Sequence, residues 1–126
     1  MSYRTDLGRV IGLGSAKEGV GHWWSQRVTS VALIPLTALA ILPLGRAIGA
    51  GREAVLETYG EPWNAVIAIL FIAVTFRHLQ QGLQVVIEDY VHAKALRTGA
   101  LLANTMLCAF AGLAGVFAVA KIAFAG

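Results

Sequence analysis

The sequence predicts an all-α integral membrane protein with three transmembrane helices and an N-terminus that faces the cytoplasm. Of its 126 residues, 57% are hydrophobic and only 13% are charged, whereas soluble domains average about 45–50% apolar and about 25% charged residues. So few charged side chains cannot cover the surface of a small soluble domain. Three apolar stretches are each long enough to cross a bilayer, which takes about 20 residues of helix. A soluble enzyme and a disordered chain are therefore excluded, and residues 1–126 form one membrane domain.

The N-terminal segment, residues 1–27, is polar and rich in glycine. It has no apolar core of the kind that a cleaved signal peptide requires, so we expect a retained arm on or near the membrane surface. The first transmembrane helix is expected at about residues 28–48. Pro35 and Pro43 lie within it, and prolines inside a helix predict a kink.

The second and third transmembrane helices are expected at about residues 64–87 and 100–124. Helices are required because lipid offers no hydrogen-bond partners to an exposed backbone. The connection over residues 49–63 is acidic, and the one over residues 88–99 carries two basic residues.

The distribution of basic residues predicts the orientation. Six of the ten Lys and Arg residues lie in the N-terminal arm and the second connection, whereas three lie in the first connection and the C-terminal segment. Because the basic side of a membrane protein faces the cytoplasm, the N-terminus is expected there and the C-terminus on the opposite side. Trp23 and Trp24 fit one membrane interface, and Trp63 fits the other.

Charge and cysteine content narrow the functional classes further. The net charge of +3 comes from scattered basic residues, without the clustered patch that nucleic-acid binding requires. We therefore expect membrane lipid and no nucleic acid among the partners. The single cysteine, Cys108, excludes an internal disulfide, a CxxC redox pair and a CxxCH site for covalent haem.

His78 lies 15 residues after Trp63 and 12 residues before Tyr90, and a helix between these two aromatic residues spans about 40 Å. This length matches a bilayer with its headgroups, so His78 falls close to mid-membrane. An ionisable side chain at that depth is costly and indicates a functional site. The alternative is a histidine that hydrogen-bonds to a neighbouring helix.

The spacing around His78 supports a ligand site. His78, Gly82, Val85 and Asp89 recur at i, i+4, i+7 and i+11, which places them on one helix face. Gly82 leaves room for a flat ligand, or alternatively serves close packing between helices. A neutral imidazole at this depth suits the axial position of haem iron, and one histidine supplies one of its two axial ligands.

Other polar residues lie at the ends of the helices or beside His78. Tyr90 next to Asp89 can hydrogen-bond a carbonyl and supply protons to a reduced product, or is an interfacial tyrosine among solvated acids. Arg27 can meet a propionate or extend to the headgroups. Arg77 needs an anion or a polar partner, and the glutamines that follow His78 are candidates for packing hydrogen bonds.

Two segments resemble a known family. They are HWWSQRVTSVALIPL over residues 22–36 and HLQQGLQVVIEDYV over residues 78–91. The sequence resembles the small hydrophobic membrane anchor subunit of bacterial succinate dehydrogenase, respiratory complex II. The shared pattern is a histidine in the second helix, a glycine four residues later, and an Asp-Tyr pair eleven and twelve residues after the histidine. The resemblance covers essentially the whole chain.

The resemblance implies a role for each of these residues. His78 would be one axial ligand of haem b, and a companion cytochrome b anchor subunit would supply the other. Tyr90 would hydrogen-bond a carbonyl of the substrate ubiquinone, with Asp89 supporting that site. Arg27 matches a family arginine near the haem propionates, and His22 is a further candidate there. The iron–sulfur and flavoprotein subunits would be partners at the bacterial cytoplasmic (inner) membrane, and this chain would be no enzyme on its own.

Three other functional classes stay open. A homodimeric small b-type cytochrome would use His78 from each of two chains. A proton-coupled exporter is disfavoured because no Asp or Glu lies at the centre of an apolar stretch. For a purely structural assembly factor, His78→Ala would leave function intact.

Overall fold

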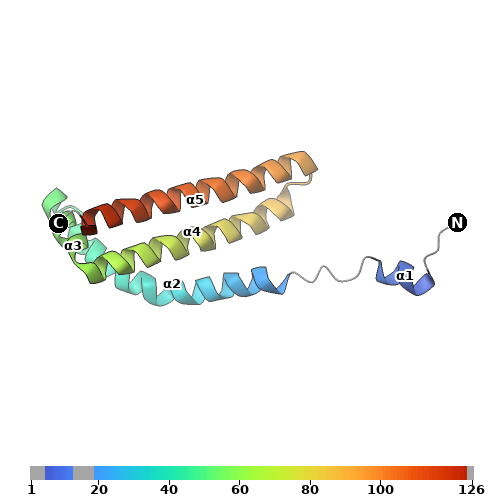
Figure 1. Cartoon of the computed structure of the whole chain (residues 1–126), viewed down its shortest axis with the longest axis horizontal. Coiled ribbons are helices and arrows are strands. Elements are labelled where there is room, and N and C mark those ends of the chain that lie inside the picture. Colours follow the sequence, from blue (N-terminus) through green and yellow to red (C-terminus); the bar gives the residue numbers. More distant parts are fainter. Residues whose placement is uncertain (1–4, 13–18, 125–126) are drawn as a thin grey trace.

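The computed structural model describes residues 5–12 and 19–124 of the chain and shows a bundle of three long antiparallel helices (Figure 1). The long helices are α2 (Val20–Ala47), α4 (Pro62–Tyr90) and α5 (Lys94–Phe124), and two short helices are α1 (Asp6–Ile11) and α3 (Gly51–Gly60). All three long helices have the length and composition to cross a membrane. The predicted all-α class with three transmembrane helices is confirmed.

Helix α4 is the centre of the bundle. It packs against α2 on one side and against α5 on the other, while α2 and α5 do not contact each other within the described residues (Figure 1). Most large apolar side chains point outward, for example Ile34, Met106 and Phe110, each at least 70% exposed. Such an outer surface is suited to lipid or to partner helices.

Two glycines of α5 bring it close to α4. A Cβ atom on Gly112 would lie 3.2 Å from the Cβ of Phe76, and one on Gly115 would lie 3.1 Å from the Cγ2 of Ile72. Both distances are shorter than the usual separation between carbon atoms of about 3.5–4.0 Å. These two glycines therefore serve close packing between α4 and α5.

A buried polar contact also joins α4 and α5. The side chain of Asn104 is buried and donates from Nδ2 to the backbone carbonyl of Gln80 at 2.9 Å. The Cys108 thiol, one turn further along α5, donates to Oδ1 of Asn104 at 3.4 Å. Both polar groups of Asn104 are therefore paired inside the bundle, as apolar surroundings require.

The helix ends differ from the ends of the apolar stretches. Helix α2 begins at Val20, eight residues before the expected start of the first transmembrane segment, so the last residues of the expected arm are helical. Helix α4 extends to residues 62 and 90, and α5 begins at residue 94. Hydropathy marks the residues suited to lipid, whereas helical hydrogen bonding continues through the polar turns at the interface. Pro35 and Pro43 do not interrupt α2.

The connection between α2 and α4 contains a helix that we did not expect. Helix α3 covers one end of the bundle and contacts all three long helices (Figure 1). Asn64 Nδ2 donates to the carbonyl of Thr58 at 3.0 Å and ties the start of α4 to α3. Tyr59 lines an apolar cavity of about 330 Å³ there with residues of the three long helices. Burial raises the pKa of the Tyr59 phenol above its ordinary value.

The expected arm is described only in part, because residues 1–4 and 13–18 lie outside the described residues. Helix α1 begins at a cap in which the Thr5 hydroxyl accepts from the backbone N–H of Gly8 at 3.1 Å. Among the described residues, α1 contacts none of the other helices (Figure 1).

Candidate functional site

His78 lies at mid-length on α4 and faces α2. Its Nδ1 is 2.9 Å from the hydroxyl of Thr29, and its Nε2 is 3.4 Å from the amide nitrogen of Gln26. Gln26 and Thr29 are three residues apart on α2, so they occupy one face of that helix. Both ring nitrogens of His78 therefore have a partner on a single neighbouring helix.

Several buried polar atoms lie along the same pair of helices without a partner in the described part of the chain. They are His22 Nε2, Gln26 Oε1, Thr75 Oγ1 and both side-chain polar atoms of Gln81, which is 1% exposed. His22 is one turn before Gln26 on α2, and Gln81 is three residues after His78 on α4. Buried polar groups are normally paired. Unpaired groups on both sides of His78 fit a site that a ligand or another subunit completes.

Gly82, one turn after His78, is not a packing glycine of the kind seen in α5. A Cβ atom there would meet only Gln26 Nε2, at the ordinary contact distance of 3.8 Å. Its role as a residue that keeps space beside His78 stays a prediction.

His78 could supply one ligand to the haem that the resemblance implies. An imidazole can bind haem iron as an axial ligand through one ring nitrogen. The other ring nitrogen of His78, Nδ1, contacts the hydroxyl of Thr29. Within the described residues, no three His, Cys, Asp or Glu side chains gather as a metal-binding set. A cavity of about 270 Å³ between α4 and α5 is lined by Arg77 but not by His78.

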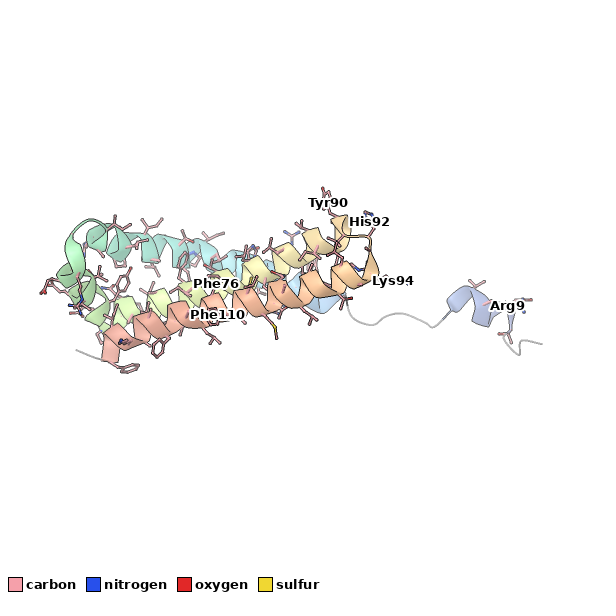
Figure 2. The ribbon with its side chains drawn as sticks, turned by 90° about the horizontal axis from the view of Figure 1, so that it is seen from above. Arg9, Phe76, Tyr90, His92, Lys94 and Phe110 are labelled. Atoms are coloured by element: carbon pink, nitrogen blue, oxygen red, sulfur yellow. The ribbon has the colours of Figure 1, made fainter. Side chains whose placement is uncertain are left out.

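Tyr90 and Asp89 lie at a different depth from His78. Tyr90 ends α4, is 79% exposed and projects away from the bundle beside His92 (Figure 2). The Nδ1 of His92 donates to the backbone carbonyl of Tyr90 at 3.1 Å. Twelve residues separate His78 from Tyr90, which corresponds to about 18 Å of helix. The structure therefore places two candidate sites along α4 and does not bring these residues together.

Arg27 and His22 lie at the start of α2, and the structure separates their side chains. The exposed guanidinium of Arg27 stacks on the ring of Trp23, with its Cζ 5.5 Å from the ring centroid. Trp23 in turn stacks on Trp24 at 6.1 Å. His22 is half-buried, and its Nε2 has no partner in the described residues. In this chain by itself, the Arg27 guanidinium therefore pairs with the Trp23 ring. The Nε2 of His22 is the polar atom that stays unpaired within the described residues.

Four side chains on one face of α4 form what we call the polar ladder: Arg77, Gln80, Gln84 and Glu88. Arg77 Nη1 donates to Gln80 Oε1 at 2.8 Å, Gln80 Nε2 to Gln84 Oε1 at 3.4 Å, and Gln84 Nε2 to Glu88 Oε1 at 2.9 Å. The polar partner that Arg77 needs is thus Gln80, and the ladder ends at a carboxylate near the end of α4.

The sequence did not reveal Gln26 and Thr29 as contacts of His78. A signal was present, because His22, Gln26 and Thr29 recur at i, i+4 and i+7 and mark a polar face at the start of α2. The face of a single helix does not reveal which residue of another helix it meets.

Three apolar helices with a histidine held between two of them at mid-depth define this chain as an integral membrane protein with a polar site inside its bundle. The family described as succinate dehydrogenase/fumarate reductase transmembrane subunit matches residues 1–119, and the chain belongs to this family. The resemblance seen in the sequence is confirmed.

Individual relatives agree with the family match. The chain is 35% identical to the succinate dehydrogenase hydrophobic membrane anchor subunit of Paracoccus denitrificans, over 97% of this chain and 94% of that protein. It is 28% identical to the subunit of the same name from Rickettsia typhi, over 83% and 84%. The succinate dehydrogenase membrane anchor subunit of Reclinomonas americana is 26% identical, over 64% and 70%. No solved structure matches the chain significantly.

Proposed function

We propose that this chain is the small membrane anchor subunit of a succinate:quinone oxidoreductase in a bacterial cytoplasmic membrane. In this proposal it holds the flavoprotein and iron–sulfur subunits at the membrane together with a companion cytochrome b anchor subunit. The chain itself carries no succinate chemistry. Its family membership and its three membrane-spanning helices support this role.

In the same proposal, His78 is one axial ligand of haem b, and the companion subunit supplies the other. When bound there, haem supplies a one-electron carrier inside the membrane. The residues of this chain would bind and orient it: His78 offers one imidazole nitrogen, and Thr29 contacts the other, Nδ1. Arg27 and His22 are assigned to the propionates, since Arg27 is an exposed cation and Nε2 of His22 has no partner within the described residues.

Tyr90 and Asp89 are assigned to the site of ubiquinone reduction. The phenol of Tyr90 would donate a hydrogen bond to a quinone carbonyl, and Asp89 would pass protons from the cytoplasm toward the reduced oxygen. Both side chains are exposed at the end of α4, where another subunit has access to complete the site.

The observation that carries the proposal is His78, an ionisable side chain held at mid-depth of an apolar helix by two residues of α2. Intramembrane histidines are rare and are used as metal ligands or proton carriers. The test is purification in mild detergent through a tag on this chain, followed by a reduced-minus-oxidised visible spectrum. Companion subunits together with a b-type haem band that disappears in His78→Ala are the expected result.

Other outcomes separate the alternatives. Haem without companion subunits would indicate the homodimeric cytochrome. Companion subunits without haem would keep the anchor role and remove His78 from the ligands. A second assay tests the quinone site: Tyr90→Phe should reduce quinone reductase activity by about tenfold or more, while succinate oxidation by a soluble dye is retained. Equal loss of both activities would indicate an assembly defect instead.

A further inference from the structure

The hydroxyl of Thr29 has three neighbours but only one proton. Its Oγ1 lies 3.0 Å from the backbone carbonyl of Ser25 and 3.0 Å from that of Gln26. It also lies 2.9 Å from Nδ1 of His78. Carbonyl oxygens only accept hydrogen bonds, so the Thr29 proton is directed to its own helix, as is common for threonine in helices. The contact with His78 must then be supplied by a proton on Nδ1.

The opposite side of the ring agrees with this assignment. With Nδ1 protonated in a neutral imidazole, Nε2 carries a lone pair and accepts. The group that faces Nε2 is the amide nitrogen of Gln26, a donor, at 3.4 Å. The reversed amide would direct the oxygen of Gln26 at the Nε2 lone pair, an acceptor against an acceptor. Gln26 and Thr29 therefore favour one tautomer of His78 together.

We propose that Thr29 is a positioning residue that fixes His78 as the Nδ1–H tautomer and directs the Nε2 lone pair at the haem iron. The inference rests on the proposed function, in which His78 is an axial ligand. Thr29 does not touch the iron. It acts through the ring, because a hydrogen bond from Nδ1–H to an acceptor holds the orientation of a ligating histidine and makes Nε2 more basic.

The two α2 residues differ in what ligation requires of them. The Thr29 hydroxyl is held by the carbonyls of its own helix, so the backbone of α2 sets where Nδ1 must point. The Gln26 amide lies on the lone pair that a metal needs, and it must move aside when the iron binds. Its long contact of 3.4 Å and flexible side chain make that displacement easy.

The first measurement tests the tautomer without haem. The full chain, labelled with ¹⁵N-histidine and reconstituted in lipid nanodiscs, should show a protonated Nδ1 and an unprotonated Nε2 for His78, assigned by comparison with His78→Gln. Thr29→Val keeps the side-chain shape and removes the acceptor, so it should yield a mixture of tautomers. Thr29→Ser should restore the single form. An Nε2–H tautomer in the unchanged chain, or an unaltered Nδ1–H form in Thr29→Val, would overturn the proposal.

The second measurement uses the assembled complex. Thr29→Val should raise the haem midpoint potential, because a less basic ligand stabilises ferric iron less, and should speed haem transfer to apomyoglobin by about 10–100-fold. The matched control is Thr105→Val, which removes an exposed hydroxyl of α5 that donates to the carbonyl of Leu101 in its own helix at 2.9 Å. A Thr29→Val complex that matches Thr105→Val in potential and haem release would overturn the role toward haem. If the complex with the unchanged chain holds no haem at all, His78 is no haem ligand, and the tautomer measurement would still decide the assignment to Thr29.

Discussion

Replacing Gly112 by alanine is expected to open the contact between α4 and α5. The added Cβ would lie 3.2 Å from the Cβ and 3.4 Å from the Cγ of Phe76, so the helices must separate by about 0.3–0.8 Å to reach ordinary carbon contact. The Cβ of Phe76 is fixed to its backbone and cannot rotate away. Overpacking of this kind costs about 1–3 kcal/mol. This corresponds to an increase of about 5- to 150-fold in the equilibrium constant for opening.

Gly99 provides the matched control on the same helix. It is exposed, and outside its own helical turn no atom of the described residues lies within 4 Å of the position of its Cβ. Gly99→Ala therefore gains the same intrinsic helix preference as Gly112→Ala, up to about 1 kcal/mol, without the clash. The difference between the two variants isolates the cost of overpacking.

Cys108 is a natural probe for this experiment, because it is buried against α4 one turn from Gly112 and is the single cysteine of the chain. Labelling of its thiol by a maleimide in dodecyl maltoside micelles, titrated with dodecyl sulfate, reports how often α4 and α5 separate. We expect Gly112→Ala to be labelled about 5- to 150-fold faster than Gly99→Ala. Equal labelling rates would refute the view that Gly112 sets the distance between the helices.

Three further results are expected. Gly82→Ala should retain the b-type haem band because its Cβ would lie 3.8 Å from Gln26, whereas Gly82→Phe should lose it; a band of full height in Gly82→Phe would contradict a space-keeping role. Asn104→Ala should destabilise the bundle by about 0.6–1.7 kcal/mol through loss of its hydrogen bond to the Gln80 carbonyl, measured by unfolding in mixed detergent, and an unchanged midpoint would argue against it. Alkaline phosphatase fused to the C-terminus should be active and green fluorescent protein there should be dark; the reverse pattern would refute the predicted orientation.

Sequence pattern was sufficient for those features that depend on one helix at a time. The number of spanning helices follows from the length of apolar stretches, and the place of His78 at mid-length of α4 follows from counting residues to its aromatic ends.

Features that depend on two helices, or on turns at the interface, were not available from the sequence in the same way. Hydropathy placed the start of the first helix at residue 28, whereas α2 begins at Val20. Helix α3 was missed because its sequence is too polar and too short to stand out as a spanning segment. The pairing of His78 with Gln26 and Thr29 depends on the relative rotation and register of α2 and α4, and periodicity along each helix does not determine either.

The polar ladder constrains the order in which its residues can be substituted during evolution. Each of its three hydrogen bonds supplies an acceptor to the side chain before it, from Glu88 back to Arg77. Loss of Gln84 would break the chain of hydrogen bonds that connects Gln80 and the Arg77 guanidinium to the Glu88 carboxylate. A lone arginine inside a membrane helix costs about 2.5–3.5 kcal/mol. Substitution of Arg77 should therefore come first in evolution, and the glutamines can then be replaced by apolar residues. An alignment of related anchor subunits should show Arg77 only where the ladder is intact, and ladders broken below a retained arginine would argue against this coupling.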